Sequence, residues 1–343
     1  MIRALLVDDS ALAIMLLSRM LRKAGDIEVV GAARDGREAL GLIERLDPSV
    51  VCTDLHMPGM DGLELTREIM ERHPRPILVV SVSVVEGSAN VFKLLEAGAV
   101  DVFTKPRGGD EAEFMRLADE LISRVRIIAG VHVFKKLKDA GLAPRTPVAP
   151  RVNAALKHNH RIVAIGASTG GPQALAMILR ALPQTFPMPV VCVQHIGEGF
   201  LTGLVEWLQS QCAVAVKVAA EGEGPAPGTV YFPPEGRHLI LDDAGRFGCS
   251  NEEPVNGHRP SITVTFRSIA ARYGPSATGI LLTGMGDDGA EGLRLIMDAG
   301  GATIAQDEAT SVVFGMPKQA IALGAAQDVL PIEGIAAALA ASA

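Results

Sequence analysis

Apolar and polar residues alternate along the first 130 residues in a way that predicts five successive units of strand and helix. Short runs of Val, Ile and Leu are each followed by a segment in which apolar residues recur every three or four positions. The predicted strands span 2–9, 28–33, 49–55, 76–82 and 101–106. Five units of this length are typical of an α/β domain whose parallel sheet carries helices on both faces.

A second alternation begins at Arg161 and differs from the first in its number of strands and in the length of its connections. Strands are predicted at 161–168, 190–196, 214–220, 229–234, 238–243, 277–286 and 302–307, with helices after several of them. We therefore expect the second half to form a doubly wound, mainly parallel α/β domain of its own and not a repeat of the first.

Between the two halves, regular periodicity fades over residues 131–158. This stretch holds prolines at 144, 147 and 150, and its Lys and Arg residues outnumber its acids. We interpret it as a linker, in which the helical state of the first third stays open. Its basic character fits either a solvated tether or a contact with an acidic partner. The predicted domains are thus 1–130 and 159–343, which suggests a regulator joined to an effector.

The composition of the chain disfavours nucleic-acid binding, membrane insertion and a disulfide or zinc framework. A net charge of −7 and a pI near 5.7 lack the basic footprint of a nucleic-acid-binding domain. No apolar stretch reaches the roughly 20 residues that a membrane helix needs, and Asp8 and Asp9 interrupt the apolar N-terminus. The four scattered cysteines form no C-x-x-C pair, which disfavours a disulfide framework or a zinc site. We therefore expect a cytoplasmic protein, and a monomer, without nucleic-acid partners or membrane insertion.

Acidic side chains gather at the predicted strand ends of the first domain. Asp8 and Asp9 end the first strand and Asp54 ends the third, and these strands are neighbours in a 2-1-3-4-5 order. Two unit charges 4 Å apart repel by about 4 kcal/mol at an effective dielectric constant of 20, so a divalent cation would stabilise the group. Oxygen ligands favour Mg²⁺. With Ser81 and Lys105 at neighbouring strand ends, Asp54 is the expected acceptor of a phosphoryl group.

The stretches LLVDDS, TDLHMPGMDG, VVS and TKP, in this order, resemble the receiver domain of two-component response regulators over about 125 residues. The resemblance implies a flavodoxin-like (βα)5 fold and phosphorylation of Asp54 by a sensor histidine kinase. The metal ligands it implies are Asp8, Asp9, Asp54 and the backbone carbonyl of His56, and the switch residues are Ser81 and Lys105. One departure is Val102, which stands where receivers usually carry an aromatic residue, with Phe103 next to it.

In the second domain, the stretch IVAIGASTGGPQAL places Ser168 between a predicted strand and a predicted helix. A turn, a phosphate-binding loop and a nucleophile all require this arrangement. The segment GASTGG is one substitution away from the dinucleotide motif G-x-G-x-x-G. That motif requires glycine where Ser168 stands and an acid at the end of the next strand, which instead ends in Gln194 and His195. A base beside the serine is therefore favoured over an adenosine site.

A serine hydroxyl becomes a good nucleophile when a neutral imidazole takes its proton and a carboxylate orients that imidazole. Asp288, in LLTGMGDDGAEG, is the best candidate for this carboxylate. Asp287 is adjacent, spacing alone does not separate the two, and either residue could serve as a helix N-cap. The chain order of serine, histidine and acid differs from that of the α/β-hydrolases, so a different fold is expected.

The segments IGASTGGPQAL, VQHI, VNGHRPS, LLTGMGDDGAEG and AQDEATSVVFGMPKQAI resemble the catalytic domain of chemotaxis protein-glutamate methylesterases, also called glutamine deamidases. The resemblance covers Arg161 to about Ala326. It implies Ser168 as nucleophile, His195 as base and Asp288 as orienting acid. The backbone amides of Met285 and Thr169 would bind the oxyanion.

This resemblance implies a phosphorylation-activated hydrolase that removes methyl esters from chemoreceptor glutamates and deamidates selected glutamines, with no cofactor in the hydrolase step. The receiver would restrain the hydrolase until Asp54 is phosphorylated. A phosphorylation-controlled adaptor without turnover is the alternative. Gly197 and Glu198 replace a proline pair that often follows the family's histidine. Whether His258 and Arg259 line the cleft stays open.

Overall fold

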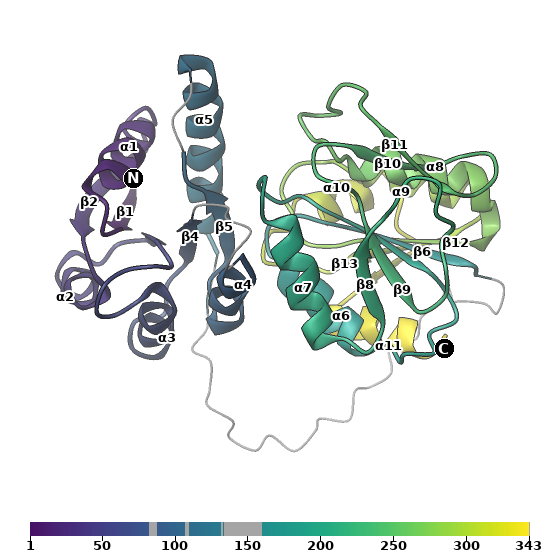
Figure 1. Cartoon of the computed structure of the whole chain (residues 1–343), viewed down its shortest axis with the longest axis horizontal. Coiled ribbons are helices and arrows are strands. Elements are labelled where there is room, and N and C mark those ends of the chain that lie inside the picture. Colours follow the sequence, from purple (N-terminus) through teal and green to yellow (C-terminus); the bar gives the residue numbers. More distant parts are fainter. Residues whose placement is uncertain (82–87, 107–109, 132, 134–159, 343) are drawn as a thin grey trace. The chain divides into compact units, whose positions relative to one another are not determined.

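The computed structural model describes residues 1–81, 88–106, 110–131, 133 and 160–342, shown in Figure 1. The chain divides into two compact units, Met1–Ala143 and Pro144–Ala343. The predicted linker, 131–158, lies outside the described residues except for 131 and 133. The proposed domain boundaries therefore stay a prediction.

The first unit contains a five-stranded parallel sheet in the order β2-β1-β3-β4-β5. This is the predicted 2-1-3-4-5 order of a flavodoxin-like domain, which is confirmed. The strands are β1 (Ile2–Val7), β2 (Ile27–Ala33), β3 (Val50–Thr53), β4 (Ile77–Ser81) and β5 (Asp101–Thr104). The helices are α1 (Ala11–Leu21), α2 (Gly36–Leu46), α3 (Gly62–Arg72), α4 (Ser88–Ala97) and α5 (Glu111–Ile128).

Local sequence explains where several of these helices begin. The side chains of Ser10, Asp35, Asp61 and Asp110 accept hydrogen bonds from backbone amides in the first turns of α1, α2, α3 and α5. Every residue of β3 and β4 is buried, as expected for central strands covered by helices on both faces. Polar side chains that follow these strands therefore emerge at the carboxyl edge of the sheet.

The second unit is built on a seven-stranded parallel sheet in the order β14-β13-β12-β6-β7-β9-β8, with a separate antiparallel pair, β10-β11. The sheet strands are β6 (Ile162–Ala167), β7 (Val190–Gln194), β8 (Ala215–Val218), β9 (Thr229–Phe232), β12 (Ala277–Leu281), β13 (Ala302–Gln306) and β14 (Asp328–Leu330). The pair is β10 (His238–Leu241) and β11 (Phe247–Ser250). The predicted strand at 238–243 thus lies outside the main sheet.

Helices cover both faces of this sheet, so the predicted doubly wound α/β fold is confirmed. On one face α6 (Gly171–Arg180) packs against α7 (Leu201–Gln211) and α11 (Ile332–Ala340). On the other, α9 (Ala290–Asp298) packs against α8 (Ile262–Tyr273) and α10 (Met316–Ala322) (Figure 1). Three adjacent central strands, β12, β6 and β7, are buried throughout, and loops that carry the candidate residues follow their carboxyl ends.

Within the described part of the chain, no helix combines the length and the apolar character needed to cross a membrane.

Candidate functional site

The acidic residues of the first unit meet at the carboxyl edge of its sheet. Asp8 and Asp54 are buried and Asp9 is exposed, and one ligand oxygen from each lies within 4.8 Å of the others. The Nζ atom of Lys105 lies 2.7 Å from carboxylate oxygens of both Asp8 and Asp54. Ser81 is buried at the end of β4, and its carbonyl accepts a hydrogen bond from the backbone amide of Lys105. The structure therefore brings the side chains of the three aspartates and Lys105 together, and joins Ser81 to Lys105 through the backbone.

The charge balance of this cluster fits a divalent cation. Burial would lower the pKa of Lys105, but its contacts with Asp54 and Asp8 outweigh burial and raise that pKa, so the ammonium stays charged. Burial raises the pKa of Asp8 in spite of its contact with Lys105. One ammonium leaves the three carboxylates with an excess negative charge, and carboxylate oxygens are the ligands that Mg²⁺ prefers. The backbone carbonyl of His56 as a further ligand stays a prediction.

Val102, which stands where receivers usually carry an aromatic residue, and its neighbour Phe103 are both buried. Val102 is 3% exposed and Phe103 is 1% exposed, and both belong to β5. No aromatic ring therefore occupies position 102, and the neighbouring ring is part of the core.

Gly62, the first residue of α3, is expected to tolerate no side chain. A Cβ atom there would lie 2.1 Å from the backbone carbonyl oxygen of Asp54, so Gly62→Ala must displace the end of β3. We expect Gly62→Ala to lower the free energy of unfolding of the first unit by about 1–3 kcal/mol. Chemical denaturation of the variant and the parent protein measures this change.

Gly41 provides the matched control. It lies in the exposed middle of α2, where an added Cβ would meet no described atom within 4 Å. Gly41→Ala is expected to raise the free energy of unfolding by about 0.5–1 kcal/mol, because alanine favours the helix. Equal destabilisation by both changes would contradict the close approach at Asp54.

Ser168 lies in a tight turn between β6 and α6. Its carbonyl accepts a hydrogen bond from the amide of Gly171 at 2.8 Å, and Gly170 has a φ of 78°, a conformation that favours glycine. The side-chain amide of Gln194 donates to the carbonyls of Ser168 and His195, both at 2.8 Å. This bridge ties the carboxyl ends of β6 and β7 together and places the serine and the histidine on adjacent strand ends.

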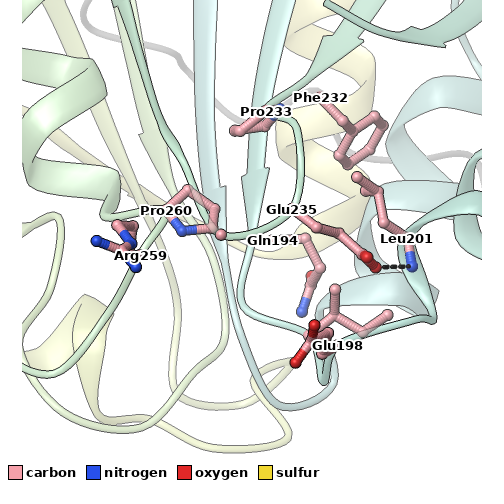
Figure 2. Close-up of a pocket in the computed structure, with 10 residues that line it drawn as sticks. Gln194, Glu198, Leu201, Phe232, Pro233, Glu235, Arg259 and Pro260 are labelled. Carbon is pink, nitrogen blue, oxygen red and sulfur yellow. Dashed lines mark hydrogen bonds between the residues drawn. The ribbon is translucent and has the colours of Figure 1, made fainter. Parts of the chain in front are cut away.

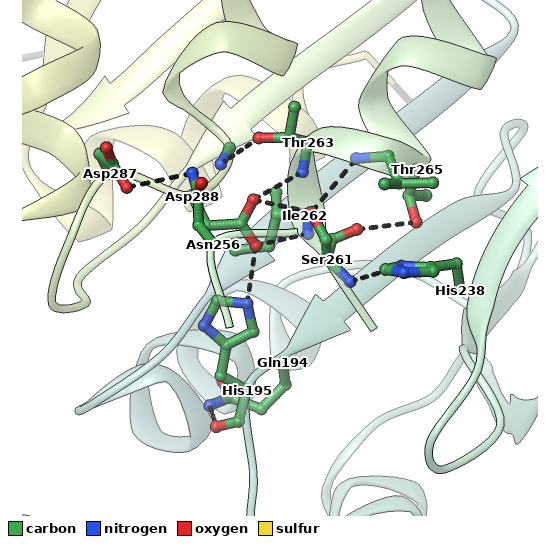
Figure 3. Close-up of polar contacts among 12 residues, drawn as sticks. Gln194, His195, His238, Asn256, Ser261, Ile262, Thr263, Thr265, Asp287 and Asp288 are labelled. Carbon is green, nitrogen blue, oxygen red and sulfur yellow. Dashed lines mark hydrogen bonds and ion pairs between the residues drawn. The ribbon is translucent and has the colours of Figure 1, made fainter. Parts of the chain in front are cut away.

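His195 and Asp288 form a direct pair. The Nε2 atom of His195 lies 2.9 Å from Oδ2 of Asp288, and both side chains are largely buried (Figure 3). Among the described residues, the Nδ1 atom of His195 has no hydrogen-bond partner, so no bond to the Ser168 hydroxyl is formed. Catalytic hydrogen bonds often tighten only when substrate binds, so this geometry is compatible with a serine and histidine pair.

Asp288 is held as a carboxylate by the beginning of α8. Its Oδ1 accepts from the Ser261 hydroxyl at 2.8 Å and the Thr263 amide at 3.0 Å, and its Oδ2 accepts from the Ile262 amide at 2.7 Å as well as from His195 (Figure 3). Burial would raise the pKa of Asp288, but the hydrogen bond and charge of His195 and these amides outweigh it and hold the pKa far below its ordinary value. The carboxylate is thus pre-organised to orient the imidazole.

The geometry separates two neighbouring acids that spacing alone left equivalent. Asp287 accepts from the side-chain amide of Asn256 at 3.4 Å, whereas Asp288 bonds to His195 (Figure 3). The residue at the N-cap of α9 is Gly289, so the open N-cap role belongs to neither acid. Asp288 instead receives the amides at the start of another helix, α8.

Three further residues support the pair: sequence reasoning missed the roles of Ser261 and His238, and it left the place of His258 open. Ser261 is the N-cap of α8 and also donates to Asp288. The fully buried His238 accepts from the Ser261 amide through Nδ1 at 3.1 Å. His258 stacks on His195, with ring centroids 3.8 Å apart and ring planes 7° apart. A serine directly before the apolar helix was a readable N-cap signal, but its contact with Asp288 spans 27 residues and had no local signal.

The loop after β12 passes beside the serine. A Cβ atom on Gly284 would lie 2.6 Å from Cβ of Ser168, which shows how closely the two backbones approach. Met285, the next residue, is 40% exposed, and Thr169 is buried. The oxyanion roles of the Met285 and Thr169 amides stay predictions.

A pocket of about 320 Å³ is lined by Gln194 and Ile196, the two residues that flank His195 in the chain, among others (Figure 2). Its walls include the apolar side chains of Ile196, Leu201, Phe232 and Pro260. Arg259 and Glu198 bring charges to it, so Arg259 does line a pocket beside the site. Glu235, also in the wall, accepts the amides of Gly199 and Leu201 and so holds the start of α7.

Both units match known families. Residues 163–339 match the family model of the CheB methylesterase, and residues 4–115 match that of the response regulator receiver domain. A protein-glutamate methylesterase/protein-glutamine glutaminase of Anaeromyxobacter dehalogenans is 45% identical over 98% of this chain and 96% of its own length. One from Geobacter metallireducens is 42% identical over 99% and 98%. The solved CheB methylesterase catalytic domain of Thermotoga maritima covers 53% of this chain and 98% of its own, with 41% identity and a TM-score of 0.52.

Proposed function

The chain belongs to the CheB methylesterase family, with a response-regulator receiver domain ahead of the catalytic domain, and we propose that Ser168, His195 and Asp288 carry its chemistry. The protein is a phosphorylation-regulated protein-glutamate methylesterase with protein-glutamine glutaminase activity. It removes methyl esters from glutamate side chains of chemoreceptors. The adaptor alternative is not favoured, because relatives over nearly the full length carry the enzyme's name.

In the proposed reaction, Nδ1 of His195 takes the proton of the Ser168 hydroxyl while the serine oxygen attacks the ester carbonyl carbon. The imidazolium that forms keeps its Nε2 proton in the hydrogen bond to Asp288. The tetrahedral intermediate collapses when His195 returns its proton to the methoxide, which leaves as methanol. Water, activated by the same imidazole, then hydrolyses the acyl-serine and releases the carboxylate.

The observation that supports this proposal is the fixed geometry of the acid and the base. Asp288 comes from the loop after β12 and His195 from the end of β7, the two strands on either side of the strand that leads to Ser168, β6. Asp288 has a donor on each of its four acceptor directions, so the imidazole bonded to it has one preferred tautomer. That tautomer leaves Nδ1 as the basic nitrogen. Backbone amides of Met285 and Thr169 are the proposed oxyanion donors, each worth about 2.7–4 kcal/mol in such sites.

Deamidation of glutamine follows the same steps with a different leaving group. The amide nitrogen takes the place of the ester oxygen, and Nδ1 of His195 would protonate this nitrogen as the C–N bond breaks, so that it leaves as ammonia. The nearby pocket offers a wall of mixed character, with apolar side chains such as Leu201 and Phe232 beside charged ones such as Arg259, to receptor side chains that flank the reacting residue. The hydrolase step uses only side chains and backbone amides of the chain and, in this proposal, no cofactor.

For the receiver, we propose that a sensor histidine kinase donates a phosphoryl group to Asp54. Asp8, Asp9, Asp54 and the carbonyl of His56 would hold Mg²⁺, which supplies charge neutralisation at the phosphoryl oxygens. Lys105 and Ser81 would bind those oxygens and transmit the change. The enzyme would act as a monomer in the cytoplasm, where the kinase and the cytoplasmic domains of the receptors are found.

Phosphorylation is expected to raise methanol release by relieving a restraint that the receiver places on the hydrolase. A small phosphoryl donor with Mg²⁺ should raise the rate of the full chain by roughly 5- to 150-fold, the usual range of coupling between two sites. Asp54→Asn should abolish that rise, because the amide cannot accept the phosphoryl group. Methanol release from methylated receptor fragments, with and without donor, measures both effects.

Asp61→Asn is the control for this experiment, since Asp61 caps α3 and belongs to the same unit. Asparagine is an equally good N-cap, so the response to the donor should persist. Stimulation of the Asp54→Asn protein equal to that of the parent would contradict the assignment of the phosphorylation site.

A further inference from the structure

A two-residue β-turn presents His258 to the active site. The amide of His258 donates to the Val255 carbonyl at 2.9 Å, and the Val255 amide donates to the His258 carbonyl at 3.1 Å. Between them, Asn256 and Gly257 both have positive φ, 51° and 79°. Two central residues in this conformation are typical of the tightest hairpin turns, which leave little freedom to the flanking residues. The turn therefore fixes the backbone from which the His258 ring extends.

The ring of His258 lies face to face with the imidazole that we assign as the base. The centroids of His258 and His195 are 3.8 Å apart and the planes differ by 7°. At this separation the rings are in van der Waals contact, so one face of His195 is covered. His258 itself is half-buried, and the His195 side chain is only 8% exposed.

We propose that His258 is a positioning residue of the hydrolase, which acts through His195 by fixing its ring plane and by stabilising the charge it acquires. This inference rests on the proposed role of His195. The hydrogen bond to Asp288 holds the imidazole at a single atom, Nε2, and by itself permits the ring to tilt about that bond. A flat ring stacked on one face removes the tilt, so that Nδ1 keeps one direction.

The stacked face also suits the charge that appears during the reaction. When His195 takes the serine proton it becomes a cation, and the face of an uncharged aromatic ring is the negative end of its quadrupole. An apolar side chain of similar volume without a π-face would also cover His195, but it would not stabilise the cation. This difference separates an electrostatic role of His258 from simple filling of space.

Contacts on both sides of the hairpin hold His258 in place. Asn256 donates to Asp287, next to the orienting acid, and Arg259 donates to the carbonyls of Asn251 and Glu252. The charged side chains on the three loops that carry His195, His258 and Asp288 are Glu198, Glu252, Glu253, Arg259, Asp287 and Asp288. Among these, Asp288 is the one that the structure bonds to His195.

Three substitutions in the full-length protein test the proposal by methanol release from a methylated receptor fragment. His258→Phe keeps a flat aromatic face, His258→Leu keeps a similar apolar volume without that face, and His258→Ala removes both. We expect His258→Leu and His258→Ala to lower kcat by roughly 3- to 30-fold with little change in KM, the range typical of a cation over an aromatic face. His258→Phe should recover most of the lost kcat.

Equal kcat values for the Phe and Leu variants, whether both normal or both low, would overturn the proposal. Thermal denaturation shows whether each variant is folded, and a folded Leu variant is sufficient for the comparison. Equal activity of the Phe and Leu variants is distinct from a failure of the proposed function, which the Ser168→Ala protein tests. If the Ser168→Ala protein still releases methanol, the assignment of the active site is wrong. If the Ser168→Ala protein is inactive while the His258→Phe and His258→Leu variants have the same kcat, only the proposed role of His258 is refuted.

Discussion

Full-length protein with Ser168→Ala is expected to release methanol from methylated receptor fragments at a rate lower by on the order of 10⁴- to 10⁶-fold. Alanine removes the only oxygen that can form the acyl-enzyme in the proposed reaction, and neither His195 nor Asp288 can replace it. The remaining activity would come from substrate binding and oxyanion stabilisation alone. Methanol release measured with phosphoryl donor present gives the greatest range for this comparison.

The loss must be separated from damage to the fold. The bonds that the structure gives Ser168 are made by its backbone, and these remain in alanine. The midpoint of thermal denaturation should therefore change little, and the receiver should still accept a phosphoryl group. Ser210→Ala is a matched control on α7, where an exposed hydroxyl donates to the Trp207 carbonyl, and it should retain normal turnover. Turnover of the Ser168→Ala protein at the rate of the control would refute the assignment of Ser168 as the nucleophile.

Much of the fold could be predicted because the strands are short apolar runs bounded by turn residues. The parallel sheets of both units follow from alternating strands and helices, and the 2-1-3-4-5 order of the first is that of the flavodoxin-like fold expected for it. The carboxyl edge of a parallel sheet collects the residues after its strands, so Asp8, Asp54 and Lys105 could be expected to meet. The same reasoning placed Ser168 and His195 on neighbouring strand ends.

The supporting contacts of the acid could not be predicted, because they depend on how a distant helix meets the strand ends. Spacing treats Asp287 and Asp288 alike, and only the arrival of the α8 N-terminus distinguishes them. The contacts of Ser261 with Asp288 and of His258 with His195 join loops from different strands. Periodicity along the chain reports which face of an element is buried, and it does not report which loop lies above a given strand end.

The Asp288→Asn protein is expected to lose activity by on the order of 10⁴-fold, because the acid both orients His195 and balances the charge of the imidazolium. All four partners of the carboxylate are donors, namely the Ser261 hydroxyl, the amides of Ile262 and Thr263, and His195. In either orientation, the NH₂ group of asparagine would therefore face another donor. With NH₂ toward His195 and Ile262, the histidine is driven to the wrong tautomer. Methanol release gives the loss, and Asp287→Asn, which keeps an acceptor for Asn256, should retain most of the activity.

The same change should destabilise the second unit in a pH-dependent way. A buried donor left without an acceptor costs about 1–3 kcal/mol, so Asp288→Asn should lower the free energy of unfolding near neutral pH by about that amount. The pKa of Asp288 is held far below its ordinary value, so its ionised form stabilises the folded chain at every pH above about 4, where an unfolded aspartate is also ionised. As the pH falls below 4 toward the folded-state pKa, this contribution is lost, and the gap between parent and variant should narrow. Denaturation at pH 7, 5, 4 and 3 tests this course, and a gap that stays constant or widens toward low pH would show that the carboxylate is not the stabilising form.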